Sequence, residues 1–513
     1  MTTSASTSPA QVQPGRGIGL FTLGASLHNI LTRLKGLPHA YPTIDLVYSS
    51  SDPIHNPILI KLPENGLRLR FDGQDQRLRL VEVLDFTKIP LAYKGSEVMK
   101  GGKADGAEQT GPKFRHIYNR LFGLSYPGEY IPPRGNEKYG TYILSYPGVA
   151  FSFPLLHSSW SPGRDFVSLM SSSAASPAKS MAVFVGESWA DSRSDLMTRQ
   201  PIYPRLTALV GKSKEFIADE IELVKVHGAG MVEFIRKTGT PVWITLSETT
   251  PQDLIAEFGP PDAIYRRSDR RITIHGGRGP VTNNSAAFGT SPSPSQLPYD
   301  PTDYDHTPDT SAIEDSDGDS SSSSPEQGSS SATGECFYNY FNHGFDVFIS
   351  QPTAPGPPFP GSSAAASLGA TSNPSQLTVT KLLLHGNIPG SYPFNRHRRS
   401  RWVLDLNGDY SLNSETPYDR ISESMKALWK RFYSNASEAA AFQRGMVLNR
   451  GWGDSPGSSV EFLGGWEEST GSKHGGHPAM ADANALGNTE LYGFPGLLFE
   501  VLKNGAVSCL TIY

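Results

Sequence analysis

Apolar and polar residues alternate with a period of two over several parts of the chain, which is the pattern of strands with one buried face. The clearest example is residues 67–83, whose first run places arginines on one face and three apolar side chains on the other, namely Leu67, Leu69 and Phe71. Asp72 and Gly73 follow that run and predict a hairpin turn. Residues 338–350 alternate in the same way and are rich in aromatic side chains, so we predict a strand there. Asn504-Gly505 predicts a last hairpin near the C-terminus.

Four other segments place apolar residues three and four positions apart, which is the spacing of one helical face. The first runs from a predicted N-cap at Ser26 to a predicted C-cap at Gly36. The third begins after Thr249 or Thr250, with Pro251 in its first turn. The four predicted apolar faces are Leu27, Ile30, Leu31 and Leu34; Phe114, Ile117, Tyr118 and Leu121; Leu254, Ile255 and Phe258; and Ile421, Met425, Leu428, Trp429 and Phe432.

Each predicted helix is followed by predicted strands. We therefore predict an α+β fold of tandem helix-plus-antiparallel-strand units around predominantly antiparallel sheets, with disordered insertions. The predicted boundaries are a disordered tail over 1–18, unit one over 19–110, unit two with a central β-rich region over 111–246, unit three over 247–275 and 335–410, and unit four over 411–513. Units one and three have the most similar order of elements. Internal duplication would explain this, as would chance recurrence of a common motif.

Three segments have compositions that cannot bury enough apolar surface to fold, and we predict that they are disordered or flexible. They are residues 276–334, 351–375 and 437–488. The first contains a serine-rich acidic tract whose hydroxyl groups suit phosphorylation, although unregulated disorder is an equally simple explanation. Much of the chain's 51 Gly and 41 Pro falls in such segments.

Charge and cysteine content exclude several classes of protein. The net charge of -5 provides no overall attraction to nucleic acid, and we predict no nucleic-acid partner. Cys336 and Cys509 are too few for a disulfide framework, which fits a cytoplasmic protein. The N-terminus lacks the apolar core of a signal peptide, and no run is long enough to cross a bilayer, so any membrane contact is expected to be peripheral.

No motif provides a convincing reaction centre. Gly186-Glu187-Ser188-Trp189-Ala190 approaches the nucleophile elbow, but Ala190 replaces the last glycine and the following residues are polar. A hydrolase with a cryptic site at Ser188 stays as an alternative. We expect His385 and Asp346 to satisfy local hydrogen bonds. The sequence therefore predicts no catalytic, cofactor-binding or metal-binding residues.

Clustered arginines are the strongest binding candidates. One cluster follows a Pro-Gly turn and the other begins a predicted strand; together they comprise Arg396, Arg398, Arg399, Arg401, Arg266, Arg267, Arg270 and Arg271. Planar guanidinium groups match phosphate or carboxylate oxygens, so the clusters predict contact with an anionic lipid headgroup or an acidic partner. Solvated strand edges, where charge only prevents aggregation, are the structural alternative.

Several motifs, in their order along the chain, resemble the phagosome assembly factor family from about Gly19 to Tyr513. They include FTLGASLHNIL, the hairpin region LRLRFDGQDQRLRLVEV, YPGVAFSF, YNYFNHGFDVFIS, KLLLHGNIPGSYPFNRHRR and LLFEVLKNGAVSCLTIY. The insertions and the N-terminal tail depart from the family pattern.

The resemblance implies a non-enzymatic adaptor in autophagy that acts at the phagophore assembly site. It also implies a WD-repeat β-propeller partner, no cofactor, and a role in recruitment to phosphoinositide-bearing membrane. A Golgi or vesicle trafficking factor is the alternative that the same resemblance leaves open. In either case the protein is expected in the cytoplasm, with Golgi association possible.

Overall fold

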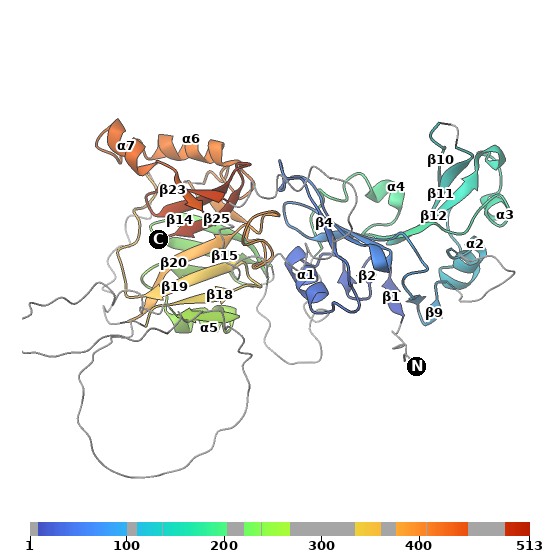
Figure 1. Cartoon of the computed structure of the whole chain (residues 1–513), viewed down its shortest axis with the longest axis horizontal. Coiled ribbons are helices and arrows are strands. Elements are labelled where there is room, and N and C mark those ends of the chain that lie inside the picture. Colours follow the sequence, from blue (N-terminus) through green and yellow to red (C-terminus); the bar gives the residue numbers. More distant parts are fainter. Residues whose placement is uncertain are drawn as a thin grey trace, which may run out of the picture.

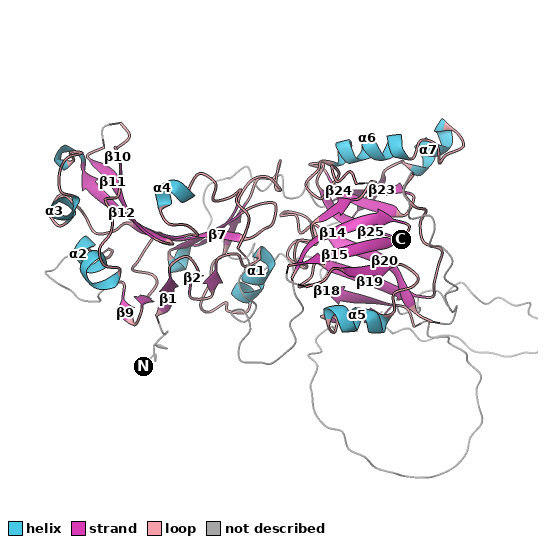
Figure 2. Ribbon diagram, turned by 180° about the vertical axis from the view of Figure 1, so that it is seen from behind, coloured by secondary structure: helices cyan, strands magenta, loops and turns pink. Residues whose placement is uncertain are grey.

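The computed structural model describes residues 9–99, 110–135, 137–202, 220–237, 239–266, 334–360, 376–406, 408–449 and 488–513. They form two lobes that lie side by side along the long axis of the molecule (Figure 1). The first lobe comprises residues 9–202 and the second comprises residues 220–513. Strands dominate both lobes, and the longer helices lie on the outside of the sheets (Figure 2).

The first lobe is built on an eight-stranded antiparallel sheet with the order β4-β5-β6-β7-β13-β12-β11-β10. Its strands are β4 (Asp45–Val47), β5 (Ile58–Leu62), β6 (Leu67–Phe71), β7 (Leu78–Val83), β10 (Glu129–Ile131), β11 (Tyr139–Tyr146), β12 (Val149–Leu156) and β13 (Ser180–Val183). A smaller sheet contains β1 (Ala10–Gln13), β2 (Gly17–Ile18), β3 (Phe21–Thr22), β8 (Leu91–Tyr93) and β9 (Ser96–Glu97). In this smaller sheet β1 pairs with β8 in parallel.

The second lobe has an eight-stranded antiparallel sheet with the order β17-β18-β19-β20-β25-β24-β23-β22. Its strands are β17 (Ala263–Arg266), β18 (Cys336–Tyr340), β19 (Phe345–Ser350), β20 (Thr378–His385), β22 (Met446–Asn449), β23 (Asn488–Phe494), β24 (Leu497–Leu502) and β25 (Val507–Ile512). The smaller sheet contains β14 (Ile221–Gly228), β15 (Met231–Arg236), β16 (Val242–Thr245) and β21 (Trp402–Leu404). Here β14 pairs with β21 in parallel.

The two lobes therefore share one topology. If the eight strands of each large sheet are numbered in chain order, both sheets read 1-2-3-4-8-7-6-5. In both lobes the chain then leaves strand 4 for a strand that pairs in parallel with the first strand of the small sheet. Such detailed agreement supports an internal duplication of whole lobes, and it explains why the order of elements after the first helix recurs after the third.

Helices occupy corresponding places in the two lobes. In the first lobe they are α1 (Leu27–Lys35), α2 (Phe114–His116, extended by a π-helical turn over Ile117–Leu121), α3 (Phe166–Met170) and α4 (Trp189–Ser192). In the second lobe they are α5 (Pro251–Phe258), α6 (Tyr418–Leu428) and α7 (Ala436–Phe442). Helices α1 and α5 precede the first strand of each large sheet, whereas α2 and α6 precede the fifth.

The α+β class with mostly antiparallel sheets is confirmed, and so are several local predictions. Ser26 caps α1 by accepting from the Asn29 N–H, and Gly36 ends that helix. Thr250 caps α5 through a capping box with Asp253. The predicted alternation over β6 is also present, because Leu67, Leu69 and Phe71 are all buried.

Other local predictions were wrong. The aromatic run over 338–350 is not one strand but the hairpin β18–β19, because Gly344 takes a left-handed φ of 85° in the turn. Ile255 on α5 is 43% exposed, and Phe432, which follows α6, is 54% exposed. The start of the predicted flexible segment 437–488 contains most of α7 and all of β22.

Most of the remaining predicted disorder lies outside the described residues, namely 1–8, 276–333, 361–375 and 450–487. The predicted disordered tail over 1–18 was wrong in its second half, because β1 and β2 lie there and pair with each other. Residues 351–360 are also described, and Phe359 in this stretch is buried in the second lobe. Among the residues that the structure describes, no helix has the length and apolar character needed to cross a bilayer.

Candidate functional site at the joint between the lobes

The connection from the large sheet to the small sheet differs between the two lobes. The chain passes from strand 4 of the large sheet to the small sheet through residues 84–90 in the first lobe and through residues 386–401 in the second. We call residues 386–401 the joint segment, because they lie against the first lobe. Phe394 in this segment packs against the hydrophobic core of the first lobe. The joint segment is therefore a longer connection of the second lobe that packs against the first lobe.

The β6–β7 hairpin loop of the first lobe is the main surface that the joint segment contacts. Gln76 and Asn387 form a buried reciprocal pair, in which Gln76 Nε2 donates to the Asn387 carbonyl at 2.7 Å and Asn387 Nδ2 donates to Gln76 Oε1 at 2.8 Å. Arg399 Nε donates to the Gln74 carbonyl at 2.6 Å. Arg401 Nη1 lies 2.6 Å from Asp75 Oδ1. These contacts use the loop that begins at the predicted Asp72 turn.

A half-buried carboxylate joins two arginines from different lobes. Glu220 lies 2.9 Å from Arg77 Nη2 of the first lobe and 3.6 Å from Arg398 Nη1 of the joint segment. Burial of the Glu220 carboxyl raises its pKa, but the charges of Arg398 and Arg77 outweigh this effect, so the pKa lies below its ordinary value. Glu220 thus stays ionised and balances both cations at the joint.

The structure corrects the expectation of a solvent-exposed basic tip. Arg398 is 8% exposed and Arg399 is 5% exposed. Arg399 donates to the backbone carbonyls of Gln74, Gly386 and Ser414, and burial lowers its pKa to about 10. The pKa of Arg401 is raised, because Asp75 and Glu415 outweigh its burial. The guanidinium groups of Arg398, Arg399 and Arg401 form internal contacts, so few of their N–H donors are available to an anionic ligand.

The remaining predicted cations are in different places. Arg396 is exposed and lies 5.8 Å from the ring centre of Phe341. Arg266 is exposed on β17, at the edge of the large sheet, and two strands separate it from β20. Arg266 and the joint segment that follows β20 therefore do not lie on one sheet edge. Arg267, Arg270 and Arg271 lie outside the described residues. Anion binding by the exposed members stays a prediction.

A buried carboxylate–histidine cluster lies beside the joint. Asp346 Oδ2 is 2.9 Å from His385 Nε2, and Asp346 Oδ1 is 2.8 Å from His397 Nε2. The two imidazole rings stack with centroids 3.8 Å apart and an interplanar angle of 12°. His385 thus forms a hydrogen bond, as the sequence predicted, but Asp346 bonds to two imidazoles rather than to a backbone group. The contribution of His397 had no sequence signal because it lies in the arginine-rich run.

These three residues form the one group of potential metal ligands that the described part of the chain brings together. Their geometry fits hydrogen bonds better than a metal ion. Parallel rings direct their two Nε2 atoms side by side, and each nitrogen meets a different oxygen of one carboxylate. A tetrahedral metal needs lone pairs that converge on one point and usually a fourth ligand. We therefore treat the cluster as a bidentate clamp that fixes β19, β20 and the joint segment.

The protonation states of the clamp follow from its surroundings. Burial tends to lower the pKa of His385, but Cys509 on β25 and Asp346 outweigh burial and raise the pKa to about 10. Burial lowers the pKa of His397 to about 4. The pKa of Asp346 is lowered because the hydrogen bonds and charges of both histidines outweigh its burial. At neutral pH the clamp therefore holds a carboxylate, one charged imidazole and one neutral imidazole.

The serine singled out in the sequence has a structural role. Ser188 caps α4 by accepting from the Asp191 N–H, and its hydroxyl donates to Asp191 Oδ2 at 2.6 Å. Ser188 is half-buried and Asp191 is exposed, and among the described residues no histidine hydrogen-bonds to this hydroxyl. The hydroxyl therefore serves the N-cap of α4 and lacks the serine–histidine contact of a nucleophile elbow.

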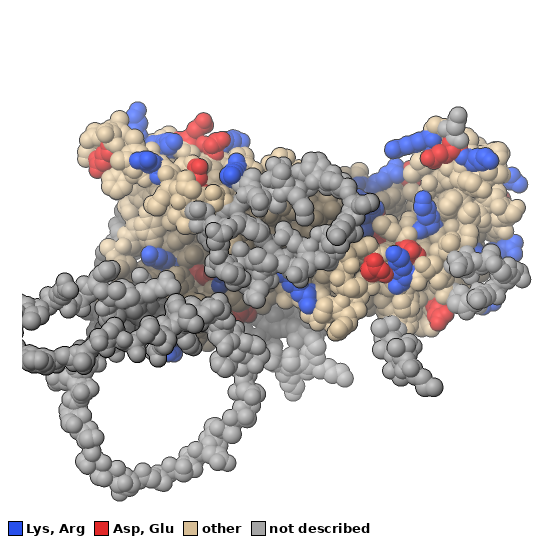
Figure 3. All heavy atoms as spheres, in the orientation of Figure 1, with Lys and Arg blue, Asp and Glu red and all other residues tan. Residues whose placement is uncertain are grey.

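Two surfaces expose large apolar side chains. They lie where the chain runs from α2 to β10 in the first lobe and from α6 to β22 in the second lobe. In the first lobe Leu124 is 85% exposed and Tyr126 is 91% exposed, next to the edge strand β10. In the second lobe Phe432 and Phe442 are 54% and 66% exposed, next to the edge strand β22. Lys and Arg side chains, with some acidic ones among them, stand at both ends of the molecule (Figure 3). Sequence patterning missed both surfaces.

Taken together, these observations define a two-lobed α+β protein with mostly antiparallel sheets, whose buried polar residues hold its lobes together. A family model for phagosome assembly factor 1, PHAF1, matches residues 17–288 and 367–513. The chain therefore belongs to the PHAF1 family.

Curated relatives support this assignment. The chain is 22% identical to a PHAF1 protein of Arabidopsis thaliana, over 98% of this chain and 92% of the relative. It is also 22% identical to a PHAF1 protein of Drosophila melanogaster, over 96% of this chain and 90% of the relative. A PHAF1 protein of Caenorhabditis elegans is 28% identical over 26% of this chain and 29% of its own length. No solved structure matches the chain.

Replacing Arg399 by Met should destabilise the protein by roughly 2–4 kcal/mol, because three buried carbonyl groups lose a charged donor. Arg396→Met is the matched control, since it removes an exposed guanidinium from the same segment and should change the free energy of unfolding by less than about 0.5 kcal/mol. Urea denaturation of both variants measures the difference. Equal effects would contradict the assigned role of the joint segment.

The clamp should be most stabilising near pH 6.5. The raised pKa of His385 means that its contribution is complete below about pH 6.5 and is lost as the pH rises toward 10. The lowered pKa of His397 means that stability is lost as the pH falls from about 6.5 toward 4. The wild-type free energy of unfolding should therefore fall from pH 6.5 to 9 by at most about 1.4 kcal/mol per pH unit.

The variant Asp346→Asn removes the charge that both histidines contact, so its stability should change less between pH 6.5 and pH 9. The decisive measurement is the difference between two pH values within each protein, since the variant also has a lower baseline. An equally steep decline in both proteins would assign the pH dependence to other groups.

Proposed function

We propose that this protein is a non-enzymatic autophagy adaptor that acts at the phagophore assembly site, binds a WD-repeat β-propeller partner and assists recruitment to phosphoinositide-bearing membrane. Membership of the PHAF1 family, which covers most of the chain, is the observation that carries the proposal. In this proposal the protein resides in the cytoplasm and reaches the membrane by recruitment.

The architecture is compatible with an adaptor. A buried polar network lies between the lobes and uses its charged groups for internal contacts, so the outer faces are left for partners. A rigid two-lobed scaffold also keeps distant surfaces at a constant separation, which is useful for a protein that brings a partner and a membrane together. The nature of the partner comes from the family resemblance.

The outer end of the first lobe is the surface that we propose for the partner. Its exposed apolar and aromatic side chains are Leu124, Tyr126, Ile131 and Tyr139. Isolated exposed hydrophobic residues are ordinary, but a tyrosine that is 91% exposed beside an exposed leucine resembles the anchors that dominate binding energy at interfaces.

The edge strand offers a second kind of contact at this end. Strand β10 pairs only with β11 in the sheet order, so its outer backbone groups face away from the sheet. An extended segment of a partner could add to this edge and gain main-chain hydrogen bonds. The Arg193–Glu129 ion pair, 2.8 Å long, keeps the carboxylate on β10 from repelling an acidic partner.

Replacing Tyr126 by Glu should reduce the affinity for the WD-repeat partner by about tenfold or more, because a charge would replace an aromatic anchor. The control Tyr265→Glu changes a tyrosine that is 71% exposed on the edge strand β17 of the other lobe. Both variants should keep the wild-type melting temperature. Binding is measured with purified proteins by biolayer interferometry, and undiminished binding of the Tyr126 variant would exclude this surface.

A further inference from the structure

The second lobe carries an exposed corner that none of the preceding roles explains. It consists of residues 426–449, which include the end of α6, the whole of α7 and the edge strand β22. None of the residues of α7 is buried, so this helix contributes little to the hydrophobic core. We call residues 426–449 the α6–α7 corner.

Large apolar side chains stand outward on the α6–α7 corner. Phe432 is 54% exposed, Phe442 is 66% exposed, Met446 is 67% exposed and Val447 is 64% exposed. Exposed apolar side chains cost free energy in water, and when they gather in one segment they mark a contact surface more often than chance. The corner therefore has the apolar component of a docking site.

A chain of aromatic contacts fixes this apolar surface to the core. Trp429 is 1% exposed, and its ring meets Phe432 with centroids 5.2 Å apart. Phe432 in turn contacts Tyr433 at 5.4 Å, and Tyr433 stacks on Phe442 at 6.0 Å. The exposed rings are thus held in place before any ligand arrives, which lowers the entropic cost of binding.

Cationic side chains surround the apolar residues. Residues 426–449 contain four cationic side chains, Lys426, Lys430, Arg431 and Arg444, against one carboxylate, Glu438. Glu438 is engaged locally, because it accepts from the Ser434 N–H at 2.8 Å. Among the described residues, none of the four cations forms an ion pair. This local excess of positive charge contrasts with the net charge of -5 for the whole chain.

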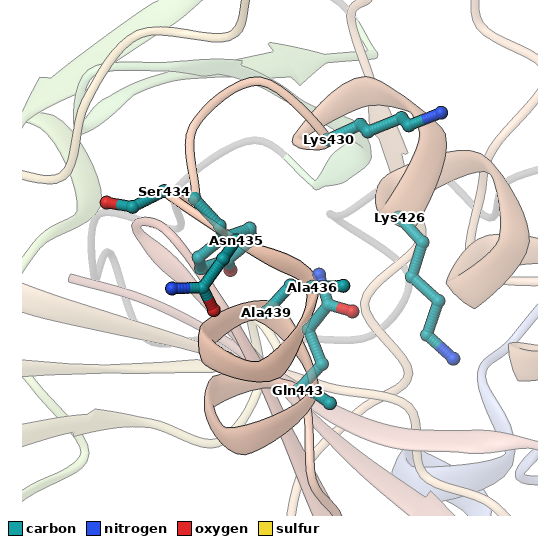
Figure 4. A pocket seen from close by; sticks show the side chains of 9 residues that line it. Lys426, Lys430, Ser434, Asn435, Ala436, Ala439 and Gln443 are labelled. Carbon is teal, nitrogen blue, oxygen red and sulfur yellow. The ribbon is translucent and has the colours of Figure 1, made fainter.

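The corner also contains an open hollow of about 640 Å³. Lys426 and Lys430 line it from the α6 side, and Ser434, Asn435 and Gln443 line it from the start and end of the α7 side (Figure 4). A hollow of this size lined by two lysines can accept a phosphate-bearing headgroup, while the neighbouring rings reach the boundary between headgroups and acyl chains.

We propose that the α6–α7 corner docks on the surface of an anionic lipid bilayer, with Lys426 and Lys430 contacting phosphate groups and Phe432, Phe442, Met446 and Val447 entering the interface. The inference rests on the proposed membrane recruitment and assigns the surface responsible for it. The combination of apolar anchors with cations favours a bilayer, because each component alone gives only weak and reversible attachment.

The test uses the purified full chain and three kinds of vesicle: phosphatidylcholine alone, phosphatidylcholine with phosphatidylserine, and phosphatidylcholine with a phosphoinositide. The wild type should float with both anionic vesicles, bind poorly to the neutral ones, and detach as salt concentration rises. Lys426→Glu with Lys430→Glu should lower the partition coefficient by about tenfold or more. Phe442→Asp with Met446→Asp should cause a similar loss.

Lys61→Glu with Lys179→Glu is the matched control, because it reverses the charge of two exposed lysines in the first lobe. This control should float like the wild type, and melting temperatures confirm that all variants fold. Undiminished flotation of the Lys426 and Lys430 variant would overturn the proposal and leave the corner to another occupant, such as an acidic protein segment. Binding of soluble inositol phosphates without flotation would also overturn it.

A pull-down separates this inference from the adaptor role. The Lys426 and Lys430 variant should retain the WD-repeat partner, because the proposed partner surface lies in the other lobe. Loss of vesicle binding with retention of the partner supports the inference. Failure of the wild type to bind that partner would count against the proposed function, whereas the vesicle result would still stand by itself.

Discussion

The balance of charge inside the joint between the lobes is the constraint on which the rest of the structure depends. Arg398 and Arg399 are buried, and a buried cation is tolerated only when it is paired or fully hydrogen-bonded. Glu220 and several backbone carbonyls from both lobes provide these partners. If the lobes separated, charged groups of each lobe would lose their partners in the other. The polar network therefore fixes how the lobes sit relative to one another.

Comparison of the two lobes shows which connection carries most of these buried charges. The two large sheets have the same strand order, and the two small sheets have the same parallel pair. Against that common plan the joint segment is an elongated version of the connection over residues 84–90. This longer connection of the second lobe contacts the first lobe, and the Asp346 clamp anchors it to the sheet from which it extends.

Sequence patterning predicted the elements better than their surroundings. Period-two runs and capping residues located most strands, α1 and α5, because these signals depend on local backbone geometry. The arginine run was misjudged for the opposite reason: Arg399 donates to carbonyl groups that are far away in the sequence, and no local pattern encodes them. Leu124 and Phe432 also gave no signal, since exposure of an apolar residue depends on what the tertiary fold leaves uncovered.

The shared strand order also explains where the chain can grow. In the second lobe the connections between strands 1 and 2, 3 and 4, and 5 and 6 hold residues 267–335, 351–377 and 450–487, whereas the corresponding connections of the first lobe hold 48–57, 72–77 and 132–138. Closing a longer loop between strands that already pair costs only about 0.6 kcal/mol for each doubling of its length. Hairpin ends are therefore the positions at which this protein can gain length, and new regulatory sequence, with little loss of thermodynamic stability.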